Sequence, residues 1–137
     1  MGFDLHLEFT LSGKPERVMQ LLTDPVLIRK WSGGEAVMAL TPGGKIELFD
    51  GWVTGNVLQT TKDELTYTWL SGDWPAGTKA SEVHYLLKKD LAGTKVILDH
   101  TGLPDKEEAD SHKQGWTDYF FDPMEDFILI IDERGGR

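Results

Sequence analysis

The sequence predicts an α+β domain in which one antiparallel sheet is covered by a long C-terminal helix. Between about residues 36 and 101, short apolar runs are separated by turns rich in glycine, proline and aspartate, which is typical of adjacent strands in a meander. After residue 104, apolar side chains recur every three or four positions, which indicates a long amphipathic helix. Because a sheet must bury its apolar face, we expect this helix to lie across it.

A strand and two short helices are predicted at the N-terminal end. Apolar side chains occupy every second position in residues 5–11, which is the period of a half-buried strand. Pro15 suits the first turn of a helix, and apolar residues follow it at helical spacing. Asp24 and Pro25 predict a second helix, with the aspartate as N-cap and the proline at the first helical position. The Gly33–Gly34 pair is expected to end that helix.

The middle of the chain reads as a series of strands joined by short turns. The predicted strands are Ala36–Leu40, Lys45–Phe49, Trp52–Thr60, Leu65–Trp69, Glu82–Lys89 and Thr94–Thr101. Asp50–Gly51 is a strong signal for a hairpin between two of them. Together with the first strand, these segments predict a curved antiparallel sheet of six to seven strands.

The last predicted hairpin determines where two histidines point. If Lys89 faces Thr94 across a four-residue turn, Val83 faces His100 on the mostly apolar side of the hairpin. His84 then points to the opposite side. We therefore expect His100 to lie in the interior of the domain and His84 to lie outside it.

The C-terminal helix is expected to run from about Pro104 to Ile131. Its apolar face is formed by Trp116, Phe120, Met124, Phe127 and Ile131. Pro123 interrupts this pattern, because it has no N–H and its ring clashes with the carbonyl of Tyr119. Asp122 is a candidate for a local cap. We expect a bend or an irregular turn between Tyr119 and Pro123.

Composition limits the classes of function. The 137 residues suit a single domain, 1–137, and the net charge of −9 disfavours nucleic acid as a partner. The sequence has no cysteine, no signal-peptide pattern and no apolar run long enough to span a membrane, so we expect a cytoplasmic location. No motif predicts a cofactor, and the four histidines lack metal-ligand spacing on any one element.

Several motifs, in this order, carry a resemblance to a known superfamily. They include Leu22–Thr23–Asp24–Pro25, Pro42–Gly43–Gly44, Gly55–Asn56–Val57, His100–Thr101–Gly102–Leu103–Pro104 and Gly115–Trp116. With the order of elements, they resemble the helix-grip superfamily of START-like (SRPBCC) and birch-pollen-allergen-like domains. Within that superfamily, the chain is similar to the family of the activator of the 90-kDa heat-shock-protein ATPase. The resemblance covers about residues 3–131 and implies a sheet that grips a long helix around an internal pocket.

The resemblance also implies a 90-kDa heat-shock chaperone as a partner. In the eukaryotic co-chaperone, a separate N-terminal domain engages the chaperone, and the resemblance does not include that domain. We therefore expect this chain alone not to stimulate the chaperone ATPase strongly.

Three functions fit this fold, and members of the superfamily differ in role. The preferred hypothesis is the binding of a small hydrophobic or amphipathic molecule in a cavity between the sheet and the C-terminal helix. The alternatives are a chaperone-interacting stress-response protein and, less favoured, a cyclase-like or hydrolase-like enzyme with His100 as acid or base. The candidate ligand contacts are Trp31, Phe49, Tyr67, Trp69, Tyr85, His100, Trp116 and Phe120.

Each of these candidates has an ordinary structural alternative. Large rings most often pack a core, and a buried histidine is most often neutral and simply hydrogen-bonded. Trp52 belongs to the same aromatic set but is not among the chosen contacts. Rigid rings fill a tapering space imperfectly, so we expect a void of about 300 Å³ or more, with neutral His100 as its polar anchor.

Overall fold

The computed structural model describes residues 3–133, with side chains described for residues 3–130. Seven antiparallel strands form one sheet in the order β1-β7-β6-β5-β4-β3-β2. The strands are β1 (Phe3–Leu11), β2 (Val37–Met38), β3 (Lys45–Leu48), β4 (Val53–Thr60), β5 (Glu64–Ser71), β6 (Ser81–Asp90) and β7 (Gly93–Leu103). The helical segments are α1 (Pro15–Thr23), α2 (Pro25–Ser32), α3 (Lys106–Gly115), the π-helical turn η1 (Trp116–Phe121) and α4 (Asp122–Glu133).

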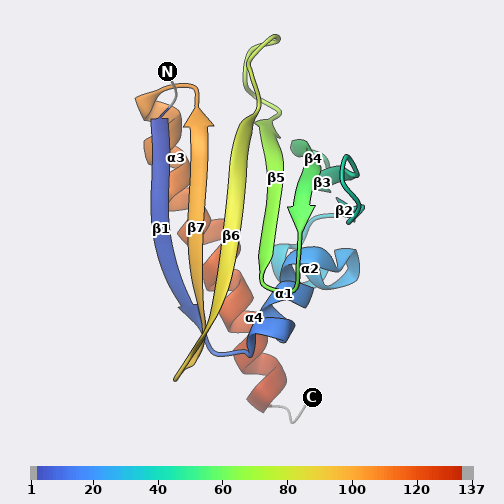
Figure 1. Cartoon of the computed structure of the whole chain (residues 1–137), viewed down its shortest axis with the longest axis vertical. Helices are drawn as coiled ribbons and strands as arrows, with labels where there is room; N and C mark the ends of the chain where they lie inside the picture. Colours follow the sequence, from blue (N-terminus) through green and yellow to red (C-terminus); the bar gives the residue numbers. More distant parts are fainter. Residues whose placement is uncertain (1–2, 134–137) are drawn as a thin grey trace.

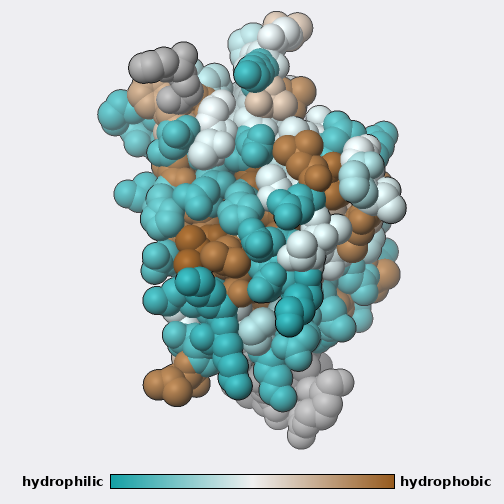
Figure 2. All heavy atoms as spheres, viewed as in Figure 1, coloured by the Kyte–Doolittle hydropathy of each residue, from teal (hydrophilic) through white to brown (hydrophobic). Residues whose placement is uncertain are grey.

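The molecule has two layers, as the sequence predicts. Figure 1 shows the C-terminal helical segments running behind β1, β7 and β6, with α1 and α2 beside α4 on the same face of the sheet. Among residues 3–133, no helix covers the opposite face of the sheet, which Figure 2 shows as largely hydrophilic with scattered hydrophobic patches. Among residues 3–133, no helix has both the length and the apolar character needed to cross a lipid bilayer.

The predicted start of α2 is confirmed at its cap. The Asp24 carboxylate accepts a hydrogen bond from the Val26 N–H at 2.9 Å, and Pro25 occupies the first helical position. Gly33 ends the helix with φ of 80°, a left-handed conformation that favours glycine. The predicted strand at 36–40 is shorter than expected, because only Val37 and Met38 form a ladder with β3.

The irregular turn predicted near Pro123 is confirmed, although it begins earlier than expected. Residues 116–121 form a π-helical turn, in which the Asp122 N–H bonds to the Thr117 carbonyl five residues before it. This wider turn lies directly before Pro123, which has no N–H to offer. Asp122 itself has helical dihedral angles, so it does not act as the new cap that the sequence suggested. The side chain of Ile131 lies outside the described residues.

The register of the last hairpin is as predicted. Val83 pairs with His100 and Lys89 pairs with Thr94 across β6 and β7. His100 is fully buried, whereas His84 lies on the outer face and contacts Glu64 at 2.8 Å. Alternation along β6 and β7 therefore carries His100 to the face that the C-terminal segments cover.

Candidate functional site

Buried hydrogen bonds around His100 connect the sheet to the C-terminal segments. The indole N–H of Trp116 donates to His100 Nδ1 at 3.1 Å, which puts the imidazole proton on Nε2. Nε2–H donates to the Ser81 hydroxyl at 2.8 Å, and that hydroxyl donates to the Trp69 carbonyl, also at 2.8 Å. Both ring nitrogens of His100 are therefore engaged within the protein.

His112 continues this network on α3. Its Nδ1–H donates to the backbone carbonyl of Glu108 at 2.9 Å, which leaves Nε2 as an acceptor. The indole N–H of Trp69 and the hydroxyl of Ser71 point at Nε2 from 3.2 Å and 3.3 Å. The indole N–H of Trp74 donates to the Glu108 carboxylate at 2.8 Å. These contacts fix α3 against β5 and the loop that follows it.

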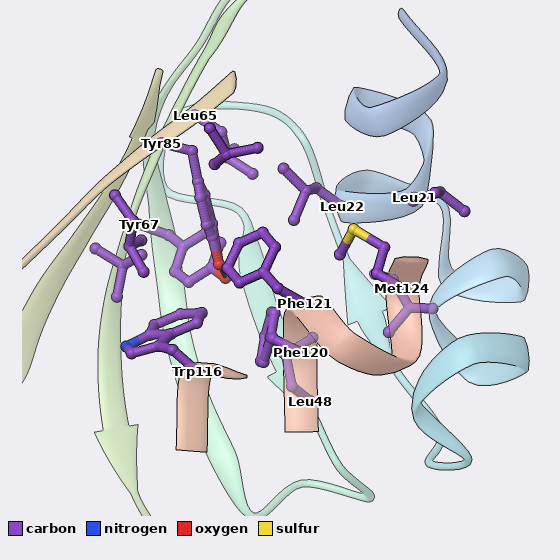
Figure 3. Close-up of a cluster of buried hydrophobic side chains, with 14 of the residues drawn as sticks. Leu21, Leu22, Leu48, Leu65, Tyr67, Tyr85, Trp116, Phe120, Phe121 and Met124 are labelled. Atoms are coloured by element: carbon purple, nitrogen blue, oxygen red, sulfur yellow. Dashed lines mark hydrogen bonds between the residues drawn. The ribbon is translucent and has the colours of Figure 1, made fainter. Parts of the chain in front are cut away.

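The centre of the interior is filled by neutral groups. Burial, followed by the nearby His112, lowers the pKa of His100 to about 3, so this imidazole is uncharged near neutral pH and is a weak base. Tyr67 and Tyr85 meet through a hydrogen bond between their hydroxyls, and burial raises the pKa of both. Figure 3 shows these two rings packed close to Trp116 and Phe121. The middle of the helix-grip interior is consequently solid.

A cavity of about 360 Å³ lies beside this solid centre. It is bounded by α3 and η1 on one side and by β5 and the β3–β4 turn on the other. Its lining consists of Phe49, Trp52, Trp69, Ser111, His112, Gly115, Trp116, Tyr119 and Phe120. Two of these rings are open to solvent: Trp52 is 43% exposed and Tyr119 is 67% exposed. The cavity is therefore mostly aromatic, with solvent access beside Trp52 and Tyr119.

Local backbone geometry brings these rings together. Phe49 and Asp50 adopt left-handed dihedral angles, with φ of 53° and 60°. The Asp50 carboxylate accepts a hydrogen bond from the Glu35 N–H at 2.8 Å, which ties this turn to the segment after α2. The ring of Phe49 consequently meets Phe120 edge-on, with their centroids 5.6 Å apart. Such tight turns and π-helical turns are frequent at functional sites.

The structure brings together four of the eight predicted contact residues. Phe49, Trp69, Trp116 and Phe120 line the cavity. Trp31, Tyr67, Tyr85 and His100 are buried in the core and are not part of the lining. The indole N–H of Trp31 donates to the Leu21 carbonyl at 2.8 Å, so this ring serves the packing of α1 against α2.

Sequence reasoning missed Ser111, His112, Gly115 and Tyr119, and it left Trp52 out of the chosen set. One signal was available, because residues 112, 115, 116 and 119 recur at helical spacing and share a face. Because the candidate contacts were chosen as large apolar side chains, apart from His100, the polar residue of this helix face, His112, was left out. Within the described residues, no three histidine, aspartate or glutamate side chains are grouped to hold a metal ion.

Comparison with known proteins gives a family. The model of the family described as "Activator of Hsp90 ATPase homolog 1-like protein" matches residues 12–128. Two curated relatives are "Activator of 90 kDa heat shock protein ATPase homolog 1" from Mus musculus and from Homo sapiens. Each is 26% identical over 117 residues, a match that covers 85% of this chain and 34% of the relative. The chain thus spans about a third of the length of the curated relatives it matches.

Solved structures share the fold. An HSP90 activator from Plasmodium falciparum superposes with a TM-score of 0.84 at 24% identity, covering 93% of this chain and 96% of the other. A protein from Mesorhizobium loti superposes with a TM-score of 0.77 at 26% identity, covering 92% and 96%. These likenesses agree with the helix-grip architecture. Since the family model matches most of its length, the chain belongs to the Activator of Hsp90 ATPase homolog 1-like protein family.

Proposed function

We propose that this domain binds a small, mainly aromatic or aliphatic molecule in the cavity between η1 and the β3–β4 turn. The observation that carries the proposal is the cavity of about 360 Å³ with six aromatic rings in its lining besides His112. Ligand pockets typically have volumes of about 300–1,000 Å³ and mostly apolar walls with few polar groups. The size and chemistry of this cavity both fall within that description.

The exposed rings at the mouth support binding of an apolar molecule. Trp52 and Tyr119 present large apolar surfaces to water, and covering such surface is favourable by about 25 cal/mol per Å². A flat ligand between them would also gain ring–ring contacts, which contribute about 0.5–1.5 kcal/mol per pair.

The polar end of the ligand is assigned to the Ser111 hydroxyl rather than to a histidine. Ser111 and His112 belong to the lining, whereas His100 does not, but both ring nitrogens of His112 already have partners within the protein. The imidazole of His112 is held in one tautomer by the Glu108 carbonyl and by Trp69, so its orientation is fixed before a ligand arrives. The proposed ligand is therefore amphipathic, with its apolar body against Phe120 and its polar group toward Ser111 on α3.

The chain's five tryptophans provide a direct test. Trp52, Trp69 and Trp116 line the cavity, whereas Trp31 and Trp74 do not. In a ¹H–¹⁵N spectrum titrated with 2-naphthol or decanoate, the three lining indole N–H signals should shift more than the other two. Equal shifts at all five, or none with either probe, would count against the cavity as a binding site.

Gly115 permits a matched pair of variants. It lines the cavity with helical dihedral angles (φ −62°, ψ −34°), and an added Cβ would make only ordinary contacts, the nearest at 3.7 Å to Tyr119. Gly115→Ala should keep binding and gain about 0.5–1 kcal/mol of stability from helix propensity. Gly115→Leu should occupy the part of the cavity beside Tyr119 and strongly reduce the indole shifts while the fold persists. Undiminished binding by Gly115→Leu would contradict the proposed location.

A second candidate function is interaction with a 90-kDa heat-shock chaperone. It is supported by family membership and by the names of the curated relatives, of which this chain matches about a third. In an NMR titration with the purified chaperone, binding would broaden the signals of residues on one surface of this domain. In an ATPase assay, this chain alone should not strongly stimulate the chaperone. Gly115→Leu separates the two functions, because it should block the small-molecule probes and leave chaperone binding intact.

A further inference from the structure

Strand β1 leaves one long edge of the sheet open. Among residues 3–133, β1 pairs only with β7, and Figure 1 shows no strand beyond it. Its pairing with β7 is regular from Leu5 to Leu11, so this part of the strand is continuous. Proteins usually protect such edges with proline, lysine, a bulge or an inward-pointing charge. The β1 segment Phe3–Leu11 contains neither proline nor lysine, and its inward-facing side chains are apolar.

The inner face of β1 is less completely buried than that of its neighbours. Leu5, Leu7 and Phe9 are only partly buried, whereas the inward residues of β7, such as Val96 and Leu98, are fully buried. A groove of about 390 Å³ lies between β1 and α3, and Leu7 and Phe9 are part of its lining. The edge therefore offers unpaired backbone groups beside apolar side chains that still contact water.

We propose that a second copy of this chain occupies this edge, with the two β1 strands antiparallel about a two-fold axis at Leu7. In this register Leu5–Phe9 of the two chains pair directly, within the regular part of each strand, and Phe3 faces Leu11 of the partner subunit. On the inner face, Leu5 lies opposite Phe9 of the partner subunit, and Leu7 lies opposite Leu7 of the partner subunit. Such cross-strand apolar pairs stabilise a sheet.

Charge complementarity on the outer face favours the same register. His6 lies opposite Glu8 of the partner subunit, and the symmetry repeats this pair. Within one chain, His6 is already 3.6 Å from Glu8 and 2.6 Å from Asp99, and Lys95 is 3.8 Å from Glu8. The opposing charges therefore extend an existing cluster across the interface.

Neighbouring registers are less favourable. A shift by one residue would place polar side chains on the core face. A shift by two residues in one direction sets Asp4 opposite Glu8 of the partner subunit, and in the other direction it sets Glu8 opposite Glu8 of the partner subunit. Like charges directly opposite each other destabilise a strand pair. The centred register combines the longest pairing with the best match of charge.

Cysteine crosslinking tests this register, because the sequence contains no cysteine. In the proposed dimer, Leu7→Cys places two thiols on the axis, with Cβ atoms about 4.5–5.5 Å apart, so a short bismaleimide should link two full chains. Thr10→Cys is the matched control, because its two copies would be about 20 Å apart, six residues removed along the strand. Efficient crosslinking of Leu7→Cys but not of Thr10→Cys is expected.

Sedimentation of the unmodified chain provides an independent readout. The sedimenting mass should rise from that of one chain toward that of two chains as the concentration increases. Leu7→Glu should keep the mass at that of one chain, because it would place two carboxylates opposite each other on the two-fold axis. Leu58→Glu is the control, because it adds the same charge to an exposed residue of β4, away from the β1 edge. A monomer at every concentration, or a dimer in which Thr10→Cys crosslinks as well as Leu7→Cys, would overturn the proposal. Protection of the β1 amides only by a different protein would assign the edge to a foreign strand and would also overturn it.

Discussion

Replacing Trp116 with phenylalanine tests the buried network that supports the candidate site. Trp116 is 2% exposed, and its indole N–H donates to His100 Nδ1. Trp116→Phe leaves that buried nitrogen without a donor, which costs about 1–3 kcal/mol. The smaller ring also buries roughly 40 Å² less apolar surface, worth about 1 kcal/mol. We expect a total loss of about 2–4 kcal/mol, which a chain with roughly 7–20 kcal/mol of stability survives folded.

Urea denaturation measures this loss directly. The midpoint should fall while the slope of the free energy of unfolding against urea stays unchanged, because the fold is retained. The loss of stability in the double variant Trp116→Phe/His100→Leu should be about 0.5–3 kcal/mol smaller than the sum of the losses in the two single variants. The reason is that the double variant no longer contains the unpaired His100 nitrogen. A loss below about 1 kcal/mol for Trp116→Phe, or strict additivity in the double variant, would refute the assigned hydrogen bond.

Three further predictions concern single positions. NMR should show His100 as the neutral Nε2–H tautomer down to about pH 5, and titration of His100 above pH 5 would contradict the assignment. Because the unfolded imidazole binds its proton near pH 6.5, His100 should lower the free energy of unfolding as the pH falls from about 6.5 toward 3. Asp99, by its hydrogen bond and its charge, raises the pKa of His6, so Asp99→Asn should lower that pKa in an NMR titration. The His6–Asp99 contact stabilises the folded state below the unfolded pKa of histidine, and this stabilisation is lost as the pH rises through the raised pKa. An unchanged pKa of His6 in the variant would show that the contact is absent in solution. Gly55→Ala should lower the free energy of unfolding by at least about 1–3 kcal/mol in thermal or urea unfolding, because its Cβ would lie 1.8 Å from the Thr68 carbonyl oxygen. A variant as stable as the original chain would mean that β4 and β5 are less close than described.

The fold was accessible from sequence because its signals are local. The two-residue period of 5–11, the Asp24–Pro25 cap and the Asp50–Gly51 turn each depend on a few neighbouring residues, and each formed as expected. The inward position of His100 followed from one hairpin register, which the turn length determines. The irregular turn before Pro123 was likewise predictable from the missing N–H of proline.

The site was only half predictable because its shape depends on tertiary packing. Whether a ring such as Tyr85 or Trp116 borders a cavity or fills a core depends on how α3 and η1 sit against β5, and this is not encoded in any short stretch. His112 and Ser111 gain their place in the lining from helix position rather than from residue type. The expected anchor, His100, was correctly placed inside but lies behind the cavity, where Trp116 and Ser81 engage both of its nitrogens.

Intermolecular nuclear Overhauser effects between bound 2-naphthol and the protein test the proposed binding function most directly. They report contacts within about 5 Å, so they locate the ligand independently of any shift in conformation. The account predicts contacts from the naphthol ring protons to Phe49, Trp52, Tyr119 and Phe120, which line the cavity, and none to Leu91 at the exposed tip of the β6–β7 hairpin. Contacts confined to the hairpin tip or to the outer face of the sheet would contradict the proposal.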